Sequence, residues 1–145
     1  MKTELVKFGS YNISKESPRV VIQNTASGII IWSGSNDRKD DFDDQLSLVI
    51  PTLLCKEVNG LVRCYTDSQS CESVAQNIGD VNFTIQAAGY VYHVRPSSLL
   101  IQDGSRCNID IAMGVQGGLT EDLIVIGQPL LKPYYLIMDF DQLTY

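Results

Sequence analysis

The chain has 145 residues, which suits one domain, and its 44% hydrophobic and 19% charged residues are ordinary for a folded globular protein. Seventeen acidic residues against 11 basic ones give a formal charge of −6, which repels phosphate backbones and anionic membrane surfaces. No apolar run approaches the roughly 20 residues that a membrane-spanning helix needs. We therefore expect no nucleic-acid partner and no membrane insertion.

The amino-terminal segment, Met1 to Leu5, lacks the apolar core of a signal peptide. We expect either that a secretory signal was removed or that the chain is part of a longer precursor. Two N-x-S/T sequons, at Asn12 and Asn82, are candidate glycosylation sites. Together with the cysteines described below, they favour the secretory pathway, ending outside the cell or in a lysosome- or vacuole-like lumen.

Seven short segments rich in β-branched or aromatic residues predict strands, and turn residues separate them. The strands are expected at 19–22, 28–32, 80–86, 90–94, 99–102, 123–126 and 134–139. Small residues between Gln86 and Gly89 predict a hairpin-like reversal into the 90–94 strand. The expected fold class is all-β, mostly antiparallel, with short helices.

Few signals indicate helices. The best helix candidate is Gln45 to Lys56, but Pro51 inside it limits the helix to a short turn on either side. The acidic stretch Ser33 to Asp44 and the stretch Lys56 to Gln76 are expected to be surface loops. The aspartates between 37 and 44 lack the glycine and terminal glutamate of an EF-hand, so neither a metal nor a cofactor is expected.

The four cysteines form an even set, which is typical of small domains in oxidising compartments and permits three full pairings. They are Cys55, Cys64, Cys71 and Cys107. No C-x-x-C spacing is present, and the single histidine, His93, lies in a strand-like run, so zinc is disfavoured. A serine hydrolase triad built on His93 is disfavoured too, because no G-x-S-x-G context occurs.

The last 21 residues carry the most specific pattern. An apolar strand ends at Gly127-Gln128, and an apolar run with a tyrosine pair follows, from Tyr134 to Asp139. Glycine beside a buried strand allows close approach of another backbone segment. The pattern resembles the closing signature of pepsin-like, cathepsin D-like aspartic proteases, in which a hydrophobic-Gly-Asp turn precedes a Tyr-Tyr strand. Gln128 departs from it, because the family usually has Asp there.

Further landmarks are similar to the carboxy-terminal lobe of that family. Asp80 to Ile85 resembles its I-x-F-x-I/L strand, Tyr90 to Pro96 its Y-x-L-x-P continuation, and Pro96 to Cys107 the segment with the second cysteine of the lobe's disulfide. The resemblance implies that Cys71 pairs with Cys107, which leaves Cys55 to pair with Cys64. It covers about Lys7 to Tyr145, so residues 1–145 are expected to form one such lobe.

The resemblance also implies that the lobe is catalytically dead. Where the family has Asp-Thr/Ser-Gly-Thr-Ser, this chain has Gln23-Asn24-Thr25-Ala26-Ser27. Aspartic proteolysis needs two carboxylates that share one proton, and an amide at Gln23 cannot serve as either. Thr25 replaces the glycine that lets the two catalytic loops approach each other. No Asp-Ser/Thr-Gly triplet occurs elsewhere in the chain.

The expected function is therefore a non-catalytic protease-like module that binds protein or forms a structural subunit. Its expected partner is an amino-terminal protease-like lobe or another protein subunit. Two alternatives stay open at this stage. The chain is the processed carboxy-terminal part of an active pepsin-like endopeptidase, or it is an inhibitor or carbohydrate-binding β-domain unrelated to proteases.

Overall fold

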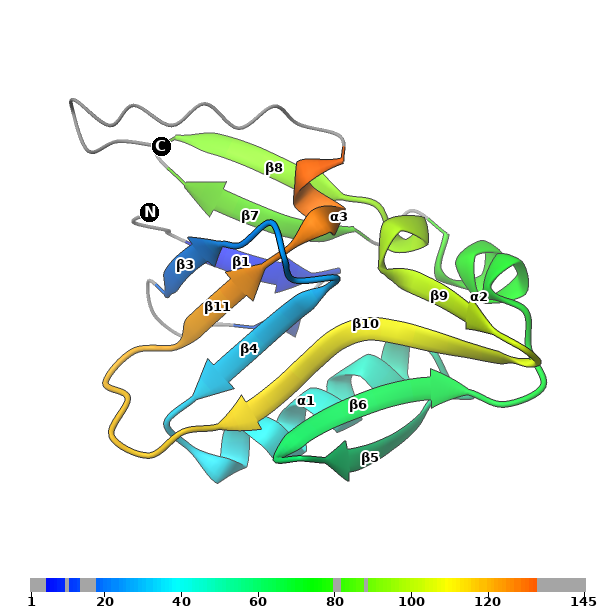
Figure 1. The fold of residues 1–145 in the computed structure, drawn as a ribbon, viewed down its shortest axis with the longest axis horizontal. Coiled ribbons are helices and arrows are strands. Elements are labelled where there is room, and N and C mark those ends of the chain that lie inside the picture. Colours follow the sequence, from blue (N-terminus) through cyan, green and yellow to red (C-terminus); the bar gives the residue numbers. More distant parts are fainter. Residues whose placement is uncertain (1–4, 10, 14–17, 80–81, 88, 133–145) are drawn as a thin grey trace.

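The computed structural model describes residues 5–9, 11–13, 18–79, 82–87 and 89–132. The described part is mostly β and contains two sheets (Figure 1). The larger sheet has the strand order β3-β11-β4-β10-β6-β5, and β9 pairs with β10 beside that path. Its strands are β3 (Arg19–Ile22), β4 (Ile29–Ser33), β5 (Leu54–Val58), β6 (Leu61–Thr66), β9 (Leu100–Asp103), β10 (Arg106–Val115) and β11 (Leu123–Ile126).

The smaller sheet has the order β2-β1-β7-β8 and is antiparallel throughout. Its strands are β1 (Leu5–Phe8), β2 (Tyr11–Asn12), β7 (Phe83–Ala87) and β8 (Tyr90–Val94). β7 and β8 form the hairpin predicted from the sequence, with Ala87 opposite Tyr90. The predicted strands at 19–22, 90–94 and 123–126 have the observed bounds, whereas the one at 134–139 lies outside the described residues.

The larger sheet is mixed rather than antiparallel, because β4 runs parallel to β10 and β3 runs parallel to β11. The longest strand, β10, was missed in the sequence analysis, although Cys107, Ile109, Ile111 and Met113 alternate with more polar or smaller residues as a half-buried strand does. Between Ile109 and Ala112, β10 advances three residues while β6 advances one. This irregularity lets one strand pair with β9 at its start and β4 at its end.

The prediction of a loop over residues 33–44 was wrong, because this stretch begins the longest helix, α1 (Asn36–Val49). The buried positions of α1 are Arg38, Phe42 and Leu46, spaced four residues apart along one helical face. Because the first of these positions is an arginine, the sequence does not show this face of the helix as an apolar stripe. The helix stops before Ile50-Pro51, because proline disfavours helical backbone in the preceding residue.

The loop predicted over residues 56–76 was also wrong. It contains most of the β5–β6 hairpin and the start of α2 (Cys71–Ile78), where Ser70 caps the helix by accepting a hydrogen bond from the Ser73 amide at 3.2 Å. Disulfides join Cys55 to Cys64 across the hairpin and Cys71 to Cys107 between α2 and β10. These are the pairs that the resemblance implies. The first disulfide links two strands within the larger sheet, and the second ties α2 to that sheet.

One hydrophobic core joins the two sheets and α1. The inner face of the larger sheet contributes fully buried Ile29, Ile31, Ile111, Met113 and Ile124, and the smaller sheet contributes Val6, Phe8, Phe83, Ile85 and Val94. Figure 1 shows α1 behind the larger sheet, and none of the described helices lies over the other face, toward the viewer. Two short helices remain, α3 (Gln128–Leu131) beside β8 and the 3-10 helix η1 (Pro96–Leu99).

A polar cluster lies where β2 approaches α1. The Arg38 guanidinium forms an ion pair with the Asp122 carboxylate at 3.3 Å, and both side chains are largely buried. The Tyr11 hydroxyl is buried and makes no hydrogen bond of good geometry among the described residues, although the Asp41 carboxylate is close enough to act on it electrostatically. Burial foremost, with a contribution from Asp41, raises the pKa of Tyr11 to about 12 against an opposing effect of Arg38.

We expect the Tyr11→Phe variant to gain stability relative to the wild type above pH 10. The folded protein retains the phenol proton up to a pKa of about 12, while the unfolded chain releases it near the ordinary tyrosine pKa of 10.0. The contribution of Tyr11 to the free energy of unfolding is therefore complete below pH 10 and is lost as the pH rises through 12. Denaturant unfolding from pH 8 to 11.5 measures the difference.

The matched control is Tyr90→Phe, because the Tyr90 side chain is 69% exposed and meets water in both states. This variant is expected to track the wild type across the range. A constant difference between Tyr11→Phe and wild type over the whole range would contradict the prediction.

Candidate functional site

The loop from Gln23 to Gly28 joins β3 to β4 and corresponds to the predicted dead site. Gln23, Asn24 and Thr25 are all exposed, and the Gln23 side-chain amide donates a hydrogen bond to the Thr25 hydroxyl at 3.0 Å. The Gln23 amide nitrogen donates to the Ile126 carbonyl, and the Ala26 amide nitrogen to the Gln23 carbonyl. The loop thus presents a neutral amide and a hydroxyl at its tip, with no carboxylate among these three side chains.

Backbone hydrogen bonds dock this loop against the segment after β11. The Gly127 amide donates to the Gly28 carbonyl at 2.9 Å, and the Gln128 amide donates to the Ala26 carbonyl at 2.9 Å. A Cβ atom on Gly127 would overlap the Ala26 carbonyl oxygen. The glycine is required here because the two backbones come closer than a side chain allows, as the sequence analysis expected of a glycine beside a buried strand.

A carboxylate that the sequence analysis did not consider lies beside the loop. Asp110 sits in the irregular part of β10, and a Cβ on Gly28 would overlap the Asp110 side chain and carbonyl. Its position depends on β4 running parallel to β10, with Ile29 opposite Ile111. No sequence motif points to this neighbour, because 82 residues separate Gly28 from Asp110. The two are brought together by strand pairing alone.

The outer face of the larger sheet, opposite α1, is predominantly apolar where β3, β11 and β4 meet. Cross-strand register places Val21, Val125 and Ile30 in one row and Leu123 and Trp32 in the next. Val21 is 41% exposed, and the other four are half-buried. The Trp32 ring covers Gly114, where an added Cβ would stand 2.5 Å from Cζ3. We call this surface, together with its continuation over β10, β6 and β5, the outer face.

The continuation of the outer face adds apolar side chains and the basic side chains of Lys56 and Arg63. Leu61 lies opposite Val58 and Gly114, and Tyr65 lies opposite Leu54 and Asn108. Leu54 and Val58 are 47% and 40% exposed. Large apolar side chains gathered on one sheet face, which no helix of the described residues covers, are typical of an interaction surface.

A hollow of about 380 Å³ lies at the start of α1. It is lined by Ser33, Asp37, Glu121 and the Arg38–Asp122 ion pair, and Glu121 is held by Arg19 at 2.7 Å. Arg38, Asp122 and Glu121 are therefore each engaged in an ion pair. Among the described residues, no group of three or more His, Cys, Asp or Glu side chains is placed to hold a metal ion.

The remaining predicted residues are scattered. Asn12 is exposed on β2, whereas Asn82 is partly buried and its carbonyl accepts a hydrogen bond from the Gly9 amide at 3.0 Å. The serine of the first sequon lies outside the described residues. The His93 ring contacts the Thr84 hydroxyl at 3.3 Å across the β7–β8 hairpin. No helix in the described part of the chain is long and apolar enough to span a membrane.

Comparison with known proteins adds no family. No protein-family model matches the chain, and no curated protein matches it.

The close docking of the loop predicts a strong asymmetry between two glycines. Gly127→Ala is expected to lower the free energy of unfolding by about 1–3 kcal/mol, because a Cβ forces the loop away from Gly127. Gly117→Ala is the matched control, since nothing lies within 4 Å of an added Cβ there. Urea unfolding of both variants measures the effect. Equal stability of the two variants would show that the loop does not pack as described.

Proposed function

We propose that this chain is a non-catalytic module with the fold of a pepsin-like carboxy-terminal lobe, which works by binding another protein chain. It acts either beside an amino-terminal protease-like lobe or as a structural subunit of a larger assembly. The observation that carries the proposal is the combination of a docked loop in the expected place with a neutral side chain, Gln23, where the family has its catalytic aspartate.

The loop geometry supports the absence of catalysis. Gln23 donates its side-chain amide to Thr25, and an amide cannot accept a proton from water or protonate a carbonyl oxygen in the working pH range. Asp110 does not replace the missing group, because its side chain packs over Gly28 rather than at the exposed tip formed by residues 23–25.

The outer face supports a binding role. Trp32, Ile30 and Leu123 are half-buried there, and α1 covers the opposite face of the same sheet. A sheet normally has its apolar surface covered by another layer. We propose that a partner chain supplies the missing layer, which is the role of the second lobe in a two-lobed protein.

Two disulfides are typical of proteins that fold in an oxidising compartment. We propose the secretory pathway, with a destination outside the cell or in a lysosome- or vacuole-like lumen. Exposed Asn12 is the better placed of the two glycosylation candidates, since Asn82 is partly buried beside Gly9.

Catalysis is tested on the assembly that contains this chain, with a peptide substrate at pH 3–6. We expect no cleavage that a statine-type inhibitor blocks. Restoring the family's residues with Gln23→Asp and Thr25→Gly is expected to give weak acid-pH proteolysis if a partner lobe supplies the second aspartate.

The matched control replaces Gln23 with Asn and Thr25 with Gly, which gives the loop the same size and backbone freedom without a carboxylate. This control is expected to stay inactive. Robust, statine-sensitive proteolysis by the unmodified assembly would refute the proposal and establish the alternative, a processed chain of an active endopeptidase.

The composition of the native particle tests the binding role. The particle is purified without reduction, its native mass is measured, and every chain in it is sequenced. A companion of similar size with a protease-like amino-terminal lobe is expected for a split two-lobed protein. A monomer that shows no companion and no self-association would contradict the binding role.

A further inference from the structure

Three cations gather at one end of the outer face, although the chain carries a net charge of −6. Lys56 lies opposite Arg63 in the β5–β6 ladder, and Arg106 begins β10 close by. Lys56 and Arg63 are exposed and make no ion pair with any described residue. We call Lys56, Arg63, Arg106 and the Tyr65 ring between them the basic cluster.

The Tyr65 ring holds two of these cations. The Arg106 guanidinium carbon lies 4.1 Å from the ring centroid, and the Lys56 ammonium nitrogen lies 5.2 Å from it. Both distances suit a cation–π interaction. Two positive groups are therefore brought to the same ring despite their mutual repulsion.

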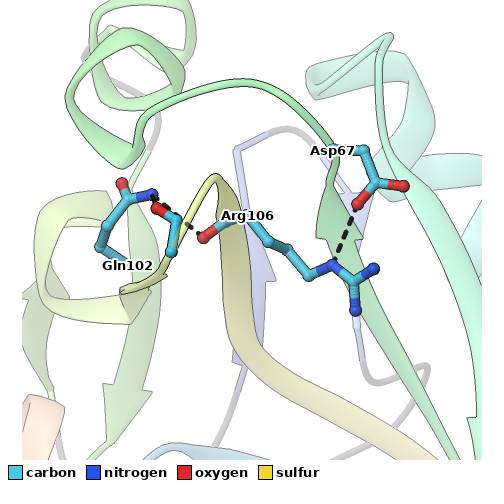
Figure 2. Close-up of polar contacts among 4 residues, drawn as sticks. Asp67, Gln102 and Arg106 are labelled. Carbon is cyan, nitrogen blue, oxygen red and sulfur yellow. Dashed lines mark hydrogen bonds and ion pairs between the residues drawn. The ribbon is translucent and has the colours of Figure 1, made fainter.

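Arg106 is held at both its side chain and its backbone (Figure 2). Its Nε donates to the Asp67 carboxylate at 3.0 Å, and its carbonyl accepts a hydrogen bond from the Gln102 side-chain amide at 3.1 Å. Gln102 in turn accepts a hydrogen bond from the amide nitrogen of Cys71, whose disulfide ends at Cys107. The guanidinium is thus preorganised, so less side-chain entropy is lost when it binds a ligand.

The terminal nitrogens of Arg106 remain available. The bond to Asp67 uses Nε, and Nη1 and Nη2 have no hydrogen-bond partner among the described residues. In Figure 2 they point away from Asp67. A guanidinium edge of this kind pairs with the two oxygens of a carboxylate. Asp67, which accepts from Arg106, and the cross-strand Asp103 offset only part of the local positive charge.

Apolar side chains adjoin the basic cluster on the same face. Leu54 lies opposite Tyr65, and Val58 and Leu61 follow one row beyond Lys56 and Arg63. Leu54 and Val58 are 47% and 40% exposed, and Ile101, opposite Asn108, is 46% exposed. The apolar groups supply binding area, while the cations select the charge of what binds.

We propose that the partner chain docks on the outer face through a segment that carries carboxylates beside apolar side chains, and that Arg106 is the group that selects it. The inference rests on the proposed binding role and adds the chemistry of the partner. Charge complementarity supports it, because the basic cluster is the part of this acidic chain that attracts an acidic segment. The exposed acids of α1 lie on the opposite side of the sheet.

The probe is an acetylated nine-residue peptide in which leucine and glutamate alternate, and its control has lysine in place of glutamate. Each is titrated into the full ¹⁵N-labelled chain at low salt while amide chemical shifts are followed. We expect the acidic peptide to shift signals in β5, β6 and the start of β10, and to bind at least tenfold more tightly than the basic one. Raising the salt concentration is expected to weaken its binding.

Arg106→Gln is expected to lower the affinity for the acidic peptide about tenfold. Tyr65→Leu is also expected to lower this affinity, although all three cations remain. Arg95→Gln removes an exposed arginine elsewhere, before η1, and is the control that is expected to leave the affinity unchanged. Thermal unfolding of each variant separates loss of binding from loss of fold.

Equal binding of both peptides to the outer face would overturn the charge selection while leaving the proposed function intact. Binding of neither peptide, or shifts confined to other elements, would overturn the inference. Self-association of the chain that Arg106→Gln abolishes would identify a second copy as the occupant and would also overturn it. Statine-sensitive proteolysis by the unmodified assembly would refute the proposed function, and the peptide-binding result would not change.

Discussion

The irregularity in β10 between Ile109 and Ala112 is the constraint on which the rest of the described structure depends. It lets a single ten-residue strand pair with β6 on both sides of the irregularity, and with β9 before it and β4 after it. The first half of β10 receives the Cys71–Cys107 disulfide and begins with Arg106, while the second half positions β4 and, through it, the loop at residues 23–28. The basic cluster and the loop at residues 23–28 are held in one structure because they share this strand.

The same strand explains why the two surfaces of the sheet differ. Cys107, Ile109, Ile111 and Met113 face the core, so the intervening residues lie on the other face of the sheet, where Ala112 and Gly114 are nevertheless buried. Alternation is preserved across the irregularity, because β10 gains an even number of residues relative to β6 there. The outer face is therefore continuous from Val21 at one edge of the sheet to Leu54 at the other. A continuous face is what a docking partner needs.

The backbone contacts of the loop at residues 23–28 do not depend on an ionisable group at position 23. The loop keeps its backbone hydrogen bonds to Ile126 and Gly127, which do not involve the Gln23 side chain. The backbone atoms that dock the loop therefore differ from the side-chain atoms at its exposed tip. Under the proposed function, the protein works through its outer face rather than through this tip.

The sequence by itself determined the elements whose signals are local. Strands at 19–22, 90–94 and 123–126, the hairpin at 86–90 and the need for glycine at 127 follow from β-branched runs and turn residues. Gln23 is likewise readable without a structure, because the absence of a carboxylate is a matter of residue type.

Only the tertiary structure decided helix α1 and the contacts between segments that are distant along the chain. Helix α1 was missed because its inner stripe begins with Arg38, whose charge is acceptable inside only through Asp122, 84 residues later. The parallel pairing of β4 with β10 placed Asp110 over Gly28, and the meeting of β5, β6 and β10 placed Lys56 and Arg106 on one tyrosine ring. These neighbours are distant along the chain, and local propensity carries no information about long-range pairing.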